Sequence, residues 1–210
     1  MFNGAFFESA SQTGVFPEES PDAFALLLEW FYGNKLCALS CQYAQPGVYS
    51  PVEALIRLYA LADMLLLPQL QDCAVSTLMG YCKIRDVGPS FQEIDLVYEL
   101  TSTGCGLRRL MVEWVVGMVK IQPGDSGEVE RSMRVCEVAS LMEGNGELII
   151  DVLMARDKVK EEGKSGSNTV VSSSGPDGGL PGAVSERVKP YDLPKCRFHV
   201  HGDGQECFYS

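Results

Sequence analysis

Histidine is scarce in this chain of 210 residues, in which only His199 and His201 occur. A Ser–His or Cys–His catalytic pair would have to draw its base from the C-terminal tail, so such an enzyme is not expected. Basic residues are also few, because 17 Lys and Arg stand against 28 Asp and Glu and give a net charge of −11. Phosphate backbones are bound by clustered cations, so nucleic acid is not an expected partner either.

Long apolar runs are absent as well. Glu29, Pro68 and Glu113 interrupt the apolar segments, so none reaches the roughly 18 residues that a membrane-spanning helix needs. The first residues, MFNGAFFES, contain neither the basic n-region nor the sustained apolar h-region of a secretory signal. We therefore expect an intracellular protein, cytoplasmic or nuclear, without a membrane span.

The eight cysteines are numerous enough for a disulfide framework. Without a secretory signal, however, they are expected to be reduced thiols. Cys73, Cys82 and Cys136 fall within helical patterns, where a thiol packs as a small apolar group.

Helical patterns fill most of the chain between residues 20 and 160. Ser20 and Ser50, each followed by proline, are typical helix starts, and Pro68 begins another helix. In the first helix Phe24, Leu27, Leu28 and Phe31 are predicted to form the buried face, with Phe31 in the core. Further helices are predicted after residue 89, from residue 107, and over 128–142 and 146–160. Their inward residues, with those of the second and third helices, are predicted to be Val52, Leu55, Ile56, Tyr59, Leu70, Cys73, Ala74, Thr77, Leu78, Tyr81, Ile94, Val97, Tyr98, Leu107, Leu110, Met111, Trp114, Val115, Met118, Leu148, Ile149, Val152 and Leu153.

Three segments are predicted to be non-helical, and one of them, residues 36–50 with Pro46 and Gly47, is predicted to be an irregular surface stretch. Residues 12–16, which end at a proline, are typical of a short strand that leads into a turn. From 161 to 190 the composition shifts to Gly, Ser and Pro with few large apolar residues, which predicts a flexible linker. The GKS at 163–165 does not form a phosphate-binding loop, because Lys158 stands where that motif needs its first glycine.

The C-terminal tail contains candidate metal ligands in Cys196, His199, His201 and Cys207. Thiolate sulfur and imidazole nitrogen suit tetrahedral zinc, and the two histidines lie on one side of an extended segment. With four protein ligands the zinc would be structural, because no position stays open for a substrate. The alternative is a tail without cofactor, in which these side chains lie near each other by chance.

Two stretches resemble the second half of a BTB/POZ domain: FFESASQTGVFPEESPDAFALLLEWFYGNKL and LIRLYALADMLLLPQLQDCAVSTL. VYELTSTGCGLRRLMVEWVV and GELIIDVL are similar to the helical extension of fungal members, and CRFHVHGDGQEC resembles the Cys/His ending of some of them. The resemblance implies a mostly α protein: a partial α+β BTB/POZ-like domain over 1–84, a BACK-like helical extension over 85–160, the linker over 161–190 and a Cys/His tail over 191–210. A full domain has a strand pair and a dimerisation helix before the part matched here, so we expect the N-terminal part to be missing and no homodimer through that helix.

The resemblance also implies a function. We expect a protein–protein interaction module without catalytic residues, which as a substrate adaptor would bind a cullin-type ubiquitin ligase scaffold. Tyr32, Asn34, Lys35 and Asp63, at loops and helix ends, are the candidate partner-binding residues. Two alternatives stay open: a truncated or regulatory fragment that pairs with full BTB chains, and a small zinc-binding protein in which the tail carries the activity.

Overall fold

The computed structural model describes residues 20–36, 50–119, 136, 138–165, 189–201 and 207. This part of the chain is mostly helical, as predicted, and contains no strand. The strand predicted at 12–16 lies outside the described residues, so the α+β character of the predicted domain has no counterpart here. None of the described helices combines the length and the apolarity that crossing a membrane requires.

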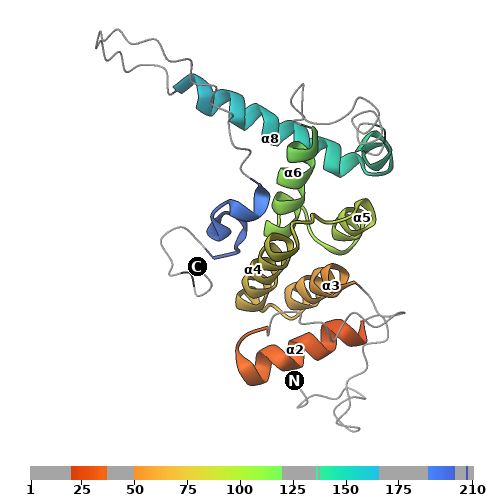
Figure 1. Ribbon diagram of the computed structural model, residues 1–210, viewed down its shortest axis with the longest axis vertical. Coiled ribbons are helices and arrows are strands. Elements are labelled where there is room, and N and C mark those ends of the chain that lie inside the picture. The colour runs from red at the N-terminus through yellow and green to blue at the C-terminus, as the bar shows by residue number, and fades with distance from the viewer. Residues whose placement is uncertain are drawn as a thin grey trace, which may run out of the picture.

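The helices are arranged as a succession of neighbours along the long axis of the molecule (Figure 1). They are α2 (Pro21–Gly33), α3 (Pro51–Met64), α4 (Pro68–Arg85), α5 (Phe91–Leu100), α6 (Gly106–Val119) and α8 (Gly146–Ser165), with the short 3-10 helices η2 (Pro190–Asp192) and η3 (Lys195–Phe198). Residues 138–144 are helical too. Helix α3 packs against α2, α4 and α5, while α6 packs against α5 and α8.

Local signals fix where several helices begin. Proline occupies the first turn of α2, α3 and α4, where the missing N–H costs nothing. Ser50 caps α3, because its hydroxyl accepts a hydrogen bond from the main-chain N–H of Glu53. Ser90 and Glu93 form a reciprocal capping box at the start of α5. The predicted helix starts at residues 21, 51 and 68 are therefore confirmed.

The predicted buried face of α2 is wrong by about one residue. Ala23, Leu26, Leu27 and Trp30 are buried, whereas Phe31 is 57% exposed. Leu28 is exposed too, and Phe24 is only partly buried. The run AFALLLEWFY is apolar on most sides, so two stripes with the same helical spacing overlap in it and the period alone cannot choose between them.

The other predicted faces are mostly correct. The four predicted residues of α3 and the three of α5 are buried, as are most of those in α4 and α6. The predicted residues that are only half-buried are Thr77, Tyr81, Trp114, Met118 and Ile149. Leu153 was predicted to face inward but is 52% exposed, since α8 buries only Leu148 and Val152 among its described side chains. Cys73 and Cys82 are buried as predicted, but Cys136 is exposed.

One hydrophobic cluster joins the two ranges predicted as separate domains. Buried side chains from α2 to α4 and from α5 to α8 belong to the same core, so no gap in the core marks residue 84. Helix α8 continues to Ser165, five residues into the predicted linker. Lys and Glu, which fill the stretch before Gly163, are good helix formers, and this explains the extra turn.

The C-terminal segment 189–201 returns to the helices far from it in sequence. Both η2 and η3 pack against α4 and α6, and Figure 1 shows this segment in blue beside these two helices. Phe198 is completely buried in the common core, and Tyr191 packs with its ring centroid 5.6 Å from that of Trp114. The tail is thus an integral part of the fold over these residues.

Candidate metal site in the C-terminal segment

The site begins at η3, which carries Cys196. His199 follows directly as the C-terminal cap of this 3-10 helix, with extended backbone angles, and its N–H donates to the carbonyl of Cys196. Phe198 lies between them in sequence and is buried in the core. Burial of this aromatic ring fixes the segment to the helices and so positions the residues on either side.

Helix α4 holds the histidine end of the site through two side chains one turn apart. The hydroxyl of Ser76 lies 2.8 Å from Nε2 of His199. The carboxylate of Asp72 accepts the main-chain N–H of Val200 at 2.6 Å. From α6, Arg109 donates to the carbonyl oxygen of His199 at 3.3 Å. The backbone and the ring of His199 are therefore held from two helices.

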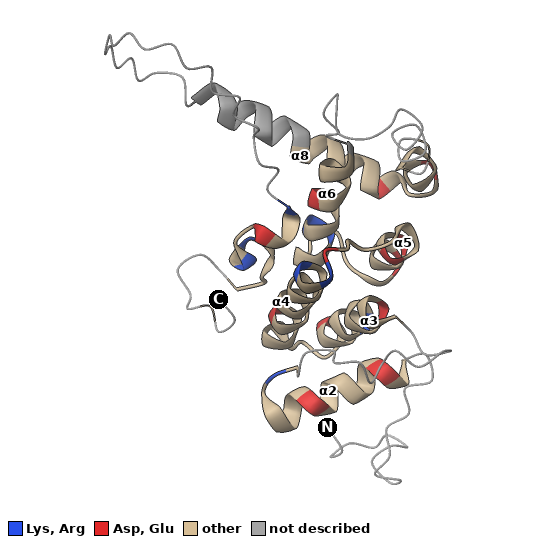
Figure 2. Ribbon diagram, viewed as in Figure 1, with Lys and Arg blue, Asp and Glu red and all other residues tan. Residues whose placement is uncertain are grey.

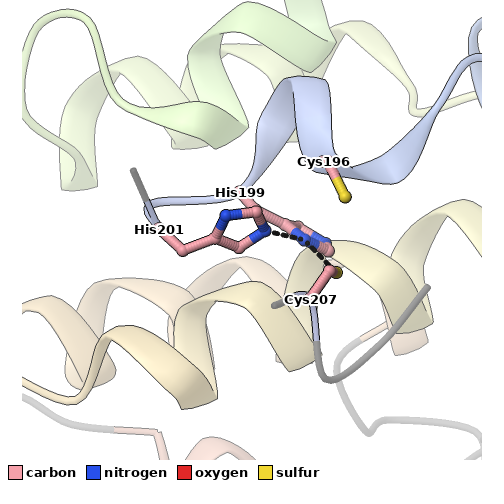
Figure 3. A group of neighbouring side chains, drawn as sticks. All are labelled: Cys196, His199, His201 and Cys207. Atoms are coloured by element: carbon pink, nitrogen blue, oxygen red, sulfur yellow. Dashed lines mark hydrogen bonds between the residues drawn. The ribbon is translucent and has the colours of Figure 1, made fainter. Parts of the chain in front are cut away.

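Four side chains gather at this point: Cys196, His199, His201 and Cys207, called the Cys/His site below. One candidate ligand atom from each lies within 4.8 Å of all the others. Nδ1 of His199 is 3.2 Å from Nε2 of His201 and 3.2 Å from Sγ of Cys207. Figure 3 shows the two imidazole rings side by side with both thiols close to them. The structure thus brings together all four predicted ligands.

These separations suit tetrahedral zinc. With Zn–N bonds of about 2.0–2.1 Å and Zn–S bonds of about 2.3 Å, a tetrahedral ion separates two nitrogens by about 3.3 Å and a nitrogen from a sulfur by about 3.6 Å. Both distances of 3.2 Å are within a few tenths of an ångström of these values. All four ligand atoms lie within 4.8 Å of one another, so side-chain shifts of about 1 Å would place them around one ion.

The hydrogen-bond partners of the His199 ring are also compatible with a bound metal ion. A neutral imidazole has one N–H and one lone pair, and Ser76 occupies the Nε2 side of the ring. The single lone pair or proton at Nδ1 therefore faces both the nitrogen of His201 and the sulfur of Cys207. Without a metal these atoms are joined by hydrogen bonds, whereas one metal ion could bind all three. In that arrangement Nε2–H donates to Ser76, the kind of outer contact that orients zinc-binding histidines.

Burial and hydrogen bonding set the protonation of the site. Burial lowers the pKa of His199, which is 3% exposed, and this favours the neutral imidazole that binds metal. A hydrogen bond with Cys207 raises the pKa of the Cys196 thiol. Metal binding must therefore displace thiol protons, as it does in thiolate sites generally.

The sequence does not predict the contacts that Ser76 and Asp72 make with this site. Ser76 precedes His199 by 123 residues and Asp72 precedes Val200 by 128, and no motif links the two regions. Asp72 does lie on the buried side of α4, where an unpaired carboxylate is unfavourable. A charged residue on an otherwise apolar helix face is the one signal that indicates a partner there.

The four predicted partner-binding residues lie at two helix ends. Tyr32 is 91% exposed near the end of α2, followed by Asn34, which caps α2 in the left-handed conformation, and by exposed Lys35. Asp63, at the end of α3, is exposed but accepts a hydrogen bond from Gln71 at 3.0 Å. Three of the four thus share one exposed helix end, while the carboxylate of Asp63 has a partner within the fold.

A pocket of about 350 Å³ lies between α3 and α5. Figure 2 shows acidic residues on both helices. Glu53 pairs with Arg57, and Glu93 accepts hydrogen bonds from Ser50 and Ser90, so two of the carboxylates already have partners. The lining residues are Glu53, Gln92, Glu93, Asp95, Leu96 and Glu99.

Comparison of the chain with protein-family models, with curated proteins and with solved structures finds no match.

Proposed function

We propose that the chain is a helical protein-interaction module whose C-terminal segment is fixed to the helices by a structural zinc ion in the Cys/His site. The observation that carries the proposal is the convergence of four ligand atoms of suitable chemistry within 4.8 Å. Four protein ligands fill the tetrahedral shell, so the zinc holds the fold together and offers no position to a substrate. In this role none of the four ligands takes part in catalysis.

The position of the site explains why a metal is useful there. The ligands lie on both sides of Phe198 in the sequence, and the ring of Phe198 is completely buried. His199 contacts Ser76 of α4, and the adjacent Val200 N–H donates to Asp72 of the same helix. A zinc ion at this point would hold residues 196–201 in place against α4 and α6. Structural zinc commonly contributes to folding in this way. A reducing intracellular compartment, cytoplasmic or nuclear, fits the reduced state of the six described cysteines.

Metal analysis of the purified full chain tests the zinc proposal. We expect about one zinc per chain in the parent protein, by the ligand count of a closed site. Cys196→Ser should lower the zinc content strongly, and Co²⁺ in place of zinc should give the visible bands of a tetrahedral thiolate complex. Cys136→Ser is the matched control, because Cys136 is exposed and lies outside the site. Equal zinc contents in the parent and in Cys196→Ser would exclude these ligands.

A second candidate function is a substrate adaptor that binds a cullin-type scaffold, as the BTB/POZ resemblance implies. It is favoured by the exposed aromatic end of α2, where Tyr32 is 91% and Phe31 57% exposed. Side chains of this kind are enriched at protein interfaces. The remaining reading, a truncated or regulatory fragment that pairs with full BTB chains, predicts binding to those chains instead.

Calorimetric titration distinguishes these two readings. The full chain is titrated with the N-terminal domain of a cullin scaffold and, separately, with a full-length BTB protein. Saturable binding to the scaffold that Tyr32→Ala weakens supports the adaptor. Ile84→Ala is the control, because Ile84 is 79% exposed but lies on α4. Binding to the BTB protein alone supports the fragment reading, and binding to neither contradicts both.

A further inference from the structure

We infer that the zinc of the Cys/His site is released by oxidation: a peroxide joins Cys196 and Cys207 in a disulfide, and the zinc leaves with half of its ligands gone. This inference rests on the proposed function, since it needs zinc in the site. It adds a form of regulation, because the hold of the metal on the C-terminal segment then depends on the redox state of the cell.

The two sulfur atoms are close enough to react. They lie within 4.8 Å of each other, and the thiols share a hydrogen bond. A disulfide bond is about 2.05 Å long, so the sulfurs must approach by less than about 3 Å.

Exposure to solvent distinguishes Cys196 from the cysteines of the core, and Cys207 is half-buried. Cys196 is exposed, whereas Cys73 and Cys82 are 3% and 1% exposed. Zinc keeps bound cysteines as thiolates, and the thiolate is the form that attacks an oxidant. An exposed zinc-bound thiolate next to a second thiolate therefore combines the accessible and the resolving sulfur of a redox pair.

The chemical step balances with one peroxide. The Cys196 thiolate attacks an oxygen of hydrogen peroxide, the O–O bond breaks, and hydroxide leaves and takes up a proton as water. The sulfenic acid formed on Cys196 is then attacked by the Cys207 thiolate. The S–S bond forms while the S–O bond breaks, and the second hydroxide also leaves as water. Two electrons pass from the two sulfurs to the peroxide, which yields two waters.

Loss of zinc follows from the ligand count. A disulfide removes both anionic ligands and leaves His199 and His201, which are neutral donors. Two imidazoles do not complete the four-ligand shell of a structural zinc site, so the affinity falls. Reduction by a thiol restores both thiolates, which makes the release reversible.

The experiment uses the full chain and begins with its zinc content before any oxidant is added. Hydrogen peroxide is then added in the presence of a colorimetric zinc chelator, and disulfides are assigned by peptide mass mapping. We expect release of about one zinc per chain together with the Cys196–Cys207 disulfide, and rebinding after addition of dithiothreitol and zinc. Cys136→Ser should behave like the parent, whereas Cys207→Ser should form no intramolecular disulfide at Cys196.

The outcomes separate the two proposals. A folded chain that contains no zinc at the start, by circular dichroism and metal analysis, overturns the proposed function and this inference with it. A chain that contains zinc but retains it under peroxide overturns this inference alone. Release of zinc with oxidation of other cysteines, or with overoxidation of Cys196 instead of the disulfide, also overturns it.

Discussion

Gly106, the first residue of α6, lies directly against the main-chain carbonyl oxygen of Phe198, and a Cβ atom on residue 106 would overlap that oxygen. Glycine is therefore required here by the close approach of two backbone segments. The contact joins the start of α6 to the residue just before His199, so α6 supports the Cys/His site in addition to α4.

Gly106→Ala should undock the C-terminal segment. The added methyl group would overlap a backbone carbonyl, which unlike the end of a flexible side chain moves only with its chain segment, and overpacking of this kind costs about 1–3 kcal/mol. Urea unfolding, followed by circular dichroism, should show this loss, and the zinc content should fall with it. Gly117→Ala is the matched control on the same helix, because nothing lies within 4 Å of its added Cβ.

In the control, alanine replaces glycine inside a helix and should raise the free energy of unfolding by about 0.5–1 kcal/mol. Equal stabilities of the two variants would show that the contact between residues 106 and 198 is dispensable.

The helices of this fold are largely predictable from local sequence, but their packing is less so. Ser50 and Pro51 mark the start of α3 through chemistry confined to a few residues, and the structure agrees. In α2, by contrast, the choice between Trp30 and Phe31 as the buried ring depends on what packs against the helix, and the periodicity does not contain that information.

In the candidate metal site, too, local sequence predicts one part, the ligands, and does not predict the other, their contacts with α4. Its ligands were predicted because residue types in a short segment indicate their chemistry. The burial of Phe198 and the contacts of His199 with Ser76 depend on a segment that returns to α4 from more than 120 residues away. Nothing in the local pattern of residues 195–201 predicts which helix they contact.

Ser76→Ala should weaken zinc binding without removing a ligand. The hydroxyl lies 2.8 Å from Nε2 of His199 and would accept its proton when Nδ1 binds the metal. Loss of such an outer contact typically lowers metal affinity by about 10–100-fold. Competition with a chelator of known affinity measures this change.

The control for this prediction is Ser102→Ala, since residue 102 is exposed in the turn before α6. An unchanged affinity in Ser76→Ala would mean that the hydroxyl does not orient the ring, or that His199 binds through its other nitrogen.

Arg108→Met should destabilise the packing of α5 and α6. Arg108 is 4% exposed, and its guanidinium lies 4.5 Å from the ring centroid of Tyr98 and donates to the carbonyl oxygens of Tyr98 and Thr101. Methionine fills similar space but leaves buried carbonyls without a donor, which costs about 1–3 kcal/mol for each such group. Chemical unfolding measures the loss.

The ion pair of Arg108 with Glu147 contributes far less, because the Glu147 side chain is 60% exposed. Glu147→Gln should therefore cost less than about 1 kcal/mol. If Glu147→Gln were as destabilising as Arg108→Met, the ion pair and not the hydrogen bonds to the backbone would be the main contribution.

Docking of residues 189–192 should depend on pH through Asp86. Hydrogen bonds from Lys189 and then from Tyr191 lower the pKa of Asp86 below its ordinary value of 3.8. A carboxylate with a lowered pKa stabilises the folded state above its ordinary pKa, and this contribution is lost as the pH falls through the lowered value. The contacts should therefore hold above about pH 4 and weaken below it.

The same contacts set the highest pH at which residues 189–192 should remain docked. The hydrogen bond to Asp86 raises the pKa of Lys189 and that of Tyr191 above their ordinary values of 10.5 and 10.0. Groups with a raised pKa contribute fully below the ordinary value, and this contribution is lost as the pH rises through the raised one. Between about pH 4 and pH 10 the docking should thus be constant.

Fluorescence of Trp114 reports this docking, because its ring packs against that of Tyr191 at 5.6 Å. Trp30→Phe removes the other tryptophan, so the remaining signal comes from α6 alone. In this background Asp86→Asn should abolish the acid change, and asparagine tolerates the left-handed backbone at this position, where φ is 53°. The side chains of Lys189 and Asp86 are 46% and 66% exposed, so salt should also weaken the acid change. An acid change that persists unaltered in Asp86→Asn would place its origin in another group.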